Sequence, residues 1–107
     1  MTTIDQLIDG YMQESEVDYI SLPQLVAAAR RWLGAGTTAE ARELTLKLVR
    51  RLYDRGLRPG DYWGGDFGYW PDEGLQPALD RIEREWIKTN ADPNLAEPIC
   101  WFAPSST

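Results

Sequence analysis

The chain of 107 residues contains no histidine and a single cysteine, Cys100. Histidine is the commonest general base and metal ligand near neutral pH, so its absence removes the usual Ser-His and Cys-His dyads. One cysteine excludes an internal disulfide framework, which makes a reducing cytoplasm the simplest expected compartment. Because Cys100 lies between Ile99 and Trp101 with no base nearby in sequence, we expect it to be a buried small hydrophobe.

The sequence also lacks a long apolar run, and no stretch approaches the roughly 20 apolar residues of a membrane span. The first ten residues hold two acids and no Lys or Arg, which is unlike a signal peptide. The glycine patterns of phosphate loops and dinucleotide sites are absent as well. These absences predict a non-enzymatic protein with no cofactor, and no membrane partner.

Basic residues are scarce outside the middle of the chain. Residues 1–29 contain five acids and no base, residues 30–58 contain eight bases and three acids, and residues 59–107 contain nine acids and three bases. The net charge of −6 repels phosphate backbones, so nucleic acid is not expected as a direct partner. The basic middle either forms a local basic face or, as we favour, pairs with the acidic ends inside the fold.

Helical periodicity and capping signals predict four helices. The apolar spacing i, i+3, i+4, i+7 and a Thr3/Gln6 capping box indicate a helix over 4–13. A Ser21/Gln24 capping box, with Ile20 and Leu25 placed as a hydrophobic staple, starts a second helix that we expect to end before Gly34. The remaining two are predicted from Thr37 to Arg55, and over about 75–88. The inner face predicted for the second helix comprises Leu22, Leu25, Val26, Ala29, Trp32 and Leu33.

Residues 57–74 are rich in glycine and aromatic side chains, and Gly64-Gly65 is a turn signal that favours a short hairpin. The apolar run 99–102 is predicted to be a strand or an extended segment, which would pair with residues 61–70. The predicted fold is therefore mainly α: a compact bundle of about four helices with a Gly/aromatic-rich loop or short hairpin and an extended C-terminal segment. It forms a single domain over 1–102, and 103–107 is predicted to be a disordered tail.

The aromatic segment supplies the candidate site. Its rings either cover an open end of the core or form a binding face together with nearby carboxylates, because aromatic residues are enriched at binding hot spots. The candidate partner-binding residues are Asp61, Tyr62, Trp63, Asp66, Tyr69, Asp72 and Glu73. Asp72 is equally suited to capping the fourth helix. Carboxylate pairs and aromatic platforms also occur in sugar hydrolases, which leaves a hydrolase or carbohydrate-binding module as an alternative, and the same acids could provide a divalent metal site.

Four segments between Tyr19 and Phe102 carry a family resemblance: LTLKLVRRLYDRGLRPGDY at 44–62, GGDFGYW at 64–70, ALDRIEREW at 78–86 and DPNLAEPICWF at 92–102. Their order and spacing resemble a family of small bacterial proteins, of immunity or otherwise unknown function, encoded beside polymorphic and contact-dependent growth inhibition toxins. The shared motifs are mostly structural and imply no catalytic residue.

The resemblance implies an immunity protein whose partner is the C-terminal domain of a cognate toxin, often a nuclease acting on tRNA or DNA. An acidic inhibitor would be steered to such a basic toxin, block its active site or an adjacent surface, and form a 1:1 complex as a monomer. The alternative is a non-enzymatic adaptor or regulatory module that acts as a homodimer.

Overall fold

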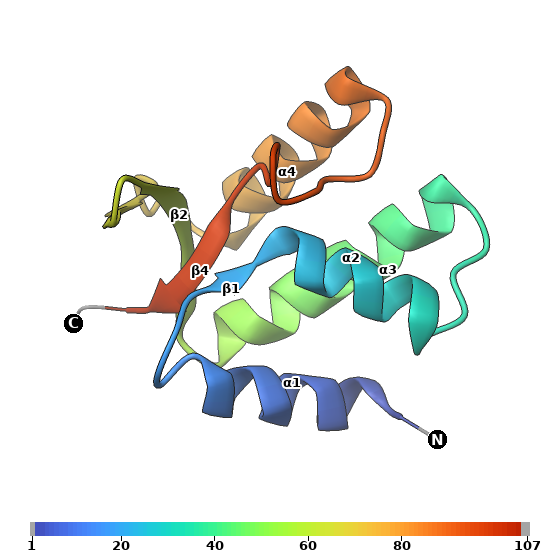
Figure 1. Ribbon diagram of the computed structural model, residues 1–107, viewed down its shortest axis with the longest axis horizontal. Helices are drawn as coiled ribbons and strands as arrows, with labels where there is room; N and C mark the ends of the chain where they lie inside the picture. Colours follow the sequence, from blue (N-terminus) through green and yellow to red (C-terminus); the bar gives the residue numbers. More distant parts are fainter. Residues whose placement is uncertain (1, 106–107) are drawn as a thin grey trace.

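The computed structural model describes residues 2–105, and within them the chain forms an α+β fold (Figure 1). The elements in chain order are α1 (Ile4–Glu14), β1 (Ile20–Ser21), α2 (Leu22–Arg31), α3 (Thr38–Asp54), β2 (Leu57–Trp63), β3 (Asp66–Tyr69), α4 (Leu75–Thr89) and β4 (Trp101–Pro104). All four predicted helices are present. The prediction of a mainly α bundle is nevertheless wrong, because four strands join into one antiparallel sheet.

Three of the four helices, α1, α2 and α3, begin where the capping signals predicted. Thr3 and Ser21 each form a complete capping box with the glutamine three residues later, and the Thr37 hydroxyl accepts from the backbone N–H of Glu40. These bonds satisfy N–H groups that a helix start leaves without a partner. The second helix ends earlier than predicted, with Trp32 at its C-cap, and the Trp32 side chain is 50% exposed rather than on the inner face.

The strand order in the sheet is β1-β4-β2-β3. The hairpin between β2 and β3 is confirmed, and both turn glycines, Gly64 and Gly65, have positive φ (59° and 89°), as a type I′ turn requires. β4 pairs with Leu57–Gly60 of β2 and with β1, so the predicted pairing with 61–70 is displaced toward the start of β2.

The predicted C-terminal tail needs a correction as well. Ala103 and Pro104 belong to β4, and Ala103 is buried because the strand runs between β1 and β2. The next backbone N–H, that of Ser105, donates to the carbonyl of Gly56. The last two positions of that predicted tail, 106 and 107, lie outside the described residues.

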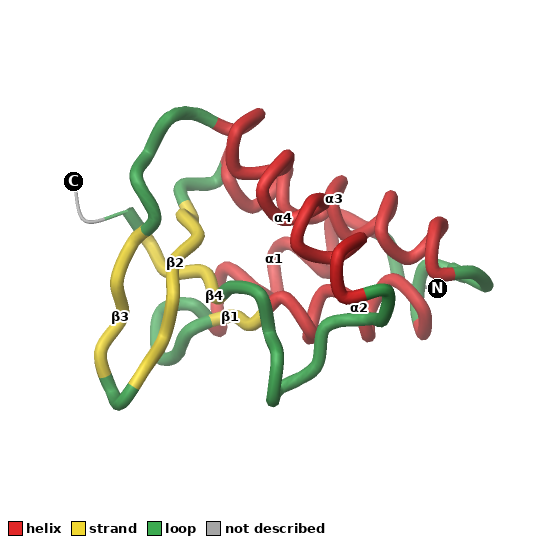
Figure 2. Tube along the Cα trace, turned by 90° about the horizontal axis from the view of Figure 1, so that it is seen from above, coloured by secondary structure: helices red, strands yellow, loops and turns green. Residues whose placement is uncertain are grey.

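The core lies between the sheet and the helices, which gather on one side of the molecule in Figure 2. Leu57 and Phe102 contribute from the sheet, Leu48 from α3 and Trp86 from α4, and each is at most 1% exposed. Cys100 is buried with them, which confirms its prediction as a buried small hydrophobe. Among residues 2–105, every helix is too short or too polar to cross a bilayer.

Ion pairs join the basic middle of the chain to its acidic ends, as we favoured from the sequence. Four of them do so: Arg30–Asp92, Arg51–Asp5, Arg55–Asp9 and Arg58–Asp72. The acids at these positions are therefore neutralised within the fold. This matters for the site, because other acids have no such partner.

Candidate binding surface and adjoining pocket

The register of the sheet gathers aromatic side chains on the face that points away from the core. Tyr62 of β2 lies opposite Phe67 of β3, and Gly60 lies opposite both Tyr69 of β3 and Trp101 of β4. Residues directly opposite in an antiparallel pair share a face, and so do alternate residues of one strand. All four rings therefore lie on the outer face, whereas Leu57 and Phe102 point into the core.

A fifth ring, that of Tyr19 just before β1, completes the group. Its centroid lies 4.8 Å from that of Phe67, in a stacked arrangement, and 5.0 Å from that of Tyr62. Tyr62 is in turn 5.5 Å from Trp101, and Phe67 is 4.9 Å from Tyr69 in an edge-on arrangement. These spacings are those of favourable aromatic pairs. We call Tyr19, Tyr62, Phe67, Tyr69 and Trp101 the aromatic face.

Gly60 makes room for this packing. A Cβ at Gly60 would lie 2.7 Å from two atoms of the Phe67 ring and 2.5 Å from the Gly68 carbonyl oxygen. Only glycine therefore lets the Phe67 ring lie against the strand at this point. The Tyr69 hydroxyl donates to the Pro104 carbonyl, so its side chain reaches across β2 to β4.

The aromatic face remains accessible. Tyr62 and Tyr69 are 40% and 43% exposed. Trp63 at the hairpin turn is 86% exposed, although the register places it on the opposite face of the hairpin. Val17, two residues before Tyr19, is equally exposed. The rings are held by one another while a large part of their surface faces solvent, and such a preformed apolar patch is typical of interaction sites.

Four acids that are not neutralised within the fold are neighbours of these rings in sequence, although the register directs the side chains of Asp61 and Asp66 to the opposite face of the hairpin. Glu16, Asp18, Asp61 and Asp66 lie within three residues of a ring of the aromatic face, and in residues 2–105 none of them forms an ion pair. Arg58 is the only base in any of the strands, and the ranges 1–29, 59–80 and 89–107 contain no Lys or Arg at all. The sheet side of the molecule is consequently aromatic and acidic.

Five of the seven predicted site residues lie on the hairpin: Asp61, Tyr62, Trp63, Asp66 and Tyr69. Sequence reasoning did not include Tyr19, Phe67 or Trp101 in the site. Phe67 alternates with Tyr69 along one strand, and this period-2 spacing is a signal that could have found it. Tyr19 and Trp101 join the group only through the pairing of β1, β4 and β2, for which the local sequence gives no direct signal.

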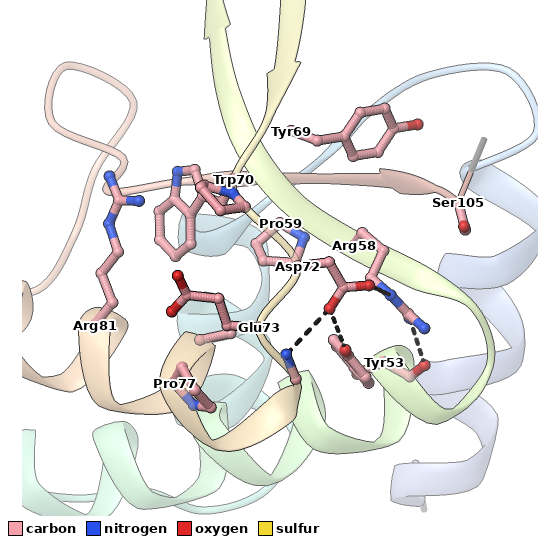
Figure 3. A pocket seen from close by; sticks show the side chains of 13 residues that line it. Tyr53, Arg58, Pro59, Tyr69, Trp70, Asp72, Glu73, Pro77, Arg81 and Ser105 are labelled. Atoms are coloured by element: carbon pink, nitrogen blue, oxygen red, sulfur yellow. Dashed lines mark hydrogen bonds and ion pairs between the residues drawn. The ribbon is translucent and has the colours of Figure 1, made fainter. Parts of the chain in front are cut away.

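The other two predicted residues, Asp72 and Glu73, line a separate cavity of about 370 Å³ between the linker 70–74, the end of α3 and the start of α4 (Figure 3). The Asp72 carboxylate accepts from the Tyr53 hydroxyl at 2.7 Å, from the Gly74 N–H at 3.2 Å and from Arg58 Nε at 3.2 Å. These bonds, that from Tyr53 above all, lower the pKa of Asp72. The same bond raises the pKa of Tyr53.

Asp72 thus holds the linker onto α3 and β2. Its carboxylate is occupied by these hydrogen bonds. Asp72 is also not the N-cap of α4, a position taken by Gly74 without any side-chain bond, so the capping alternative is wrong. Glu73 is exposed and makes no ion pair in the described part of the chain. Only Glu73 of these two acids is available to a partner.

Arginines of the chain itself cover two of the three large rings that line the pocket; the third ring, that of Tyr69, also belongs to the aromatic face. The Arg58 guanidinium lies 3.7 Å from the centroid of Tyr53, and that of Arg81 lies 3.7 Å from the centroid of Trp70, which is only 7% exposed. Cation–π contacts of this kind satisfy the ring faces from within the protein. Two of the pocket's rings therefore already contact a cation of the protein, in contrast to the rings of the aromatic face.

The remaining candidate chemistry is sparse. Burial raises the pKa of the Cys100 thiol well above its ordinary value, with the nearby charges of Glu85 and Asp61 acting in the same direction. A thiol in this state is a poor nucleophile. Across residues 2–105, His, Cys, Asp and Glu side chains do not gather in any group of three that could hold a metal ion.

No protein-family model, curated protein or solved structure matches this chain significantly. The candidate site consequently rests on the geometry of the sheet and the charges around it.

Proposed function

We propose that this chain is a non-enzymatic inhibitor, an immunity protein that binds a cationic bacterial toxin and neutralises it by covering its active site or an adjacent surface. One observation carries the proposal. An open sheet face presents five packed aromatic rings, and four acids without ion-pair partners lie on the same hairpin and just before β1, in a part of the molecule almost devoid of bases. The buried Cys100 suits action in a reducing cytoplasm.

The aromatic face supplies the binding energy in this proposal. Tyr and Trp are the commonest hot-spot residues of protein interfaces, where truncating one of them costs about 2 kcal/mol or more. The rings of Tyr62 and Tyr69 are already held by their neighbours, so little side-chain freedom is lost when a partner covers them. Trp63, which touches no other ring among those described, projects from the turn as an additional anchor.

The acids determine which partner is favoured. Asp61 and Asp66 on the hairpin and Asp18 beside Tyr19 would attract a basic surface and accelerate its association. Toxins that cleave nucleic acids need basic surfaces for the phosphate backbone. An acidic inhibitor that docks on such a surface also competes directly with the nucleic acid.

The proposal is tested with the toxin domain encoded beside the gene for this chain. Calorimetry should give a 1:1 complex, and stopped-flow association should slow as salt is added. The Trp63→Ala variant should weaken binding at least about tenfold. Trp32→Ala is the matched control, since it removes a half-exposed tryptophan from the end of α2, and should leave the affinity within about twofold.

A second pair of variants tests the role of charge. Asp66→Lys should reduce the association rate, whereas Glu83→Lys, which makes the same change on α4, should not. The absence of any complex, or equal effects of the sheet and helix variants, would remove the proposal. A stable dimer that binds no toxin would support the homodimeric regulatory module in its place.

A further inference from the structure

The sheet has an open edge at β3. Within the described residues β3 pairs only with β2, and Figure 2 shows β3 along the border of the molecule with no helix or loop on its outer side. An edge strand presents unpaired backbone donors and acceptors to solvent, which makes it a template for another strand. The opposite edge, β1, has only two residues, so it offers less backbone.

The register identifies the free groups. A two-residue turn closes the hairpin, so Trp63 and Asp66 exchange backbone hydrogen bonds and the bonding then alternates along the strands. Gly68 therefore points its N–H and carbonyl toward β2, while Phe67 and Tyr69 point theirs outward. The bond from the Trp70 N–H to the Pro59 carbonyl, at 3.0 Å, continues this alternation.

The backbone groups of Phe67 and Tyr69 have no hydrogen-bond partner in any loop or helix of the described chain. The next outward position is Pro71, which has no N–H and therefore ends the edge. A Cβ at Gly68 would meet nothing within 4 Å. The common protections of an edge, a lysine or a proline within the strand, are absent from β3.

We propose that the β3 edge accepts an extended basic segment of the partner as a fifth strand of the sheet, a mode of recognition known as β-augmentation. The backbone groups of Phe67 and Tyr69 bind this segment, and its alternate side chains lie along the adjoining aromatic face. This inference rests on the proposed function and specifies how the same surface recognises its partner.

Charge decides between a basic segment and a second copy of this chain. Pairing two β3 edges would bring together two chains of net charge −6, with Asp61 and Asp66 of both copies in one continuous sheet. No base lies within residues 59–80 to offset them. A lysine- or arginine-bearing strand instead neutralises these acids, so a basic segment is the favoured occupant.

A synthetic peptide of about eight residues, within the usual length of a strand, provides the probe. It carries Lys at alternate positions with Val or Thr between them, and it is added at low salt to the full chain labelled with nitrogen-15. When about nine-tenths of the protein is bound, amide exchange at Phe67 and Tyr69 should slow about tenfold, because exchange then proceeds from the free fraction. The amide of Gly68 points inward and should change little, which makes it an internal control.

Two further peptides and one measurement complete the test. A version with Glu for Lys and a version with every amide N-methylated should both fail to slow exchange, the first through charge and the second through the loss of its donors. Binding without slower exchange at Phe67 and Tyr69, or equal binding of the N-methylated peptide, would overturn the inference. Sedimentation equilibrium showing dimers of the chain alone, with those same two amides protected, would overturn it in favour of a second copy.

The inference and the proposed function fail in different ways. If the toxin domain binds but leaves exchange at Phe67 and Tyr69 unchanged, the inference is wrong while the proposed function stands. If the basic peptide protects both amides but no toxin complex forms, the edge recognises basic strands and the immunity function is wrong.

Discussion

Replacing Gly60 by alanine is the most direct perturbation of the aromatic face. The added methyl group would lie 2.7 Å from the Phe67 ring and 2.5 Å from the Gly68 carbonyl oxygen, whereas carbon atoms in good contact are about 3.5–4.0 Å apart. The ring can rotate away, but the carbonyl belongs to the neighbouring strand. The hairpin must therefore open locally, and Phe67 must leave its positions beside Tyr19 and Tyr69.

The expected cost follows from these contacts. Inserting a methyl group into a well-packed site costs about 1–3 kcal/mol, and the lost ring pairs of Phe67 contribute about 0.5–1.5 kcal/mol each. Restricting the unfolded chain at a former glycine offsets about 0.5–1 kcal/mol. We expect a net loss of about 3 kcal/mol, which lowers Tm by roughly 15 °C for a chain of this size.

Gly68→Ala is the matched control, because it makes the same change one strand away, where a Cβ meets nothing within 4 Å. Urea denaturation followed by tryptophan fluorescence should place Gly68→Ala within about 0.5 kcal/mol of the parent chain. Near-ultraviolet circular dichroism should lose aromatic signal only in Gly60→Ala. Equal midpoints for the two variants would refute the packing argument.

Three other predictions concern the core and the pocket. Leu48→Ala, at a position with no exposed surface, should lower the free energy of unfolding by about 2–5 kcal/mol in urea; a loss below about 1 kcal/mol would contradict the assigned core. At a pH near about 8.5, the ordinary pKa of a cysteine thiol, Cys100 should react with a thiol reagent only as fast as the protein opens, because burial raises the pKa of its thiol. Rapid labelling of the native protein would contradict this. Because hydrogen bonds lower the pKa of Asp72 below 3.8, its stabilising effect should be complete above about pH 4 and disappear as pH falls through the folded value. Asp72→Asn should remove that part of the acid dependence of the urea midpoint, and an unchanged dependence would show that the carboxylate does not contribute.

The sequence predicted what depends on near neighbours in the chain. Capping boxes operate over three residues, so the starts of α1 and α2 could be identified from Thr3 and Ser21 alone. The hairpin likewise followed from adjacent glycines. The first half of β2 was hidden, because Pro59 and Gly60 are both rare in strands. Pro59 is tolerated since its carbonyl accepts from Trp70, and this pairing needs no donor from the proline.

The same distinction applies to the candidate site. The hairpin acids and aromatics were predicted together because they are close in sequence. The complete aromatic face also depends on β4, which pairs with β2 although β3 and α4 lie between them in the chain. Trp101 therefore entered the aromatic face only with the structure. For Asp72 the local sequence was misleading. It suggested a helix cap, but the carboxylate accepts hydrogen bonds from Tyr53 and Arg58 instead.

The charge is distributed unevenly over the molecule, and the net charge alone does not describe this. The ion pairs are partly exposed and contribute little to stability, at most about 1 kcal/mol each. Their larger consequence is that they neutralise Asp5, Asp9, Asp72 and Asp92, which then contribute little to the electric field outside the protein.

The bases without an ion pair in residues 2–105 all lie on α2, α3 or α4, namely Arg31, Arg42, Lys47, Arg50, Arg84 and Lys88. The helices also carry six acids without an ion pair, namely Glu14, Glu40, Glu43, Asp54, Asp80 and Glu83, so their charges cancel. The excess negative charge therefore lies on the strands and loops, where every base of residues 2–105 is in an ion pair. A cationic surface that approaches from solution is consequently attracted mainly to the strands and loops before any contact forms. Orientation by this field is the reason that charge reversal at Asp66 should change the rate of association more than the same change at Glu83.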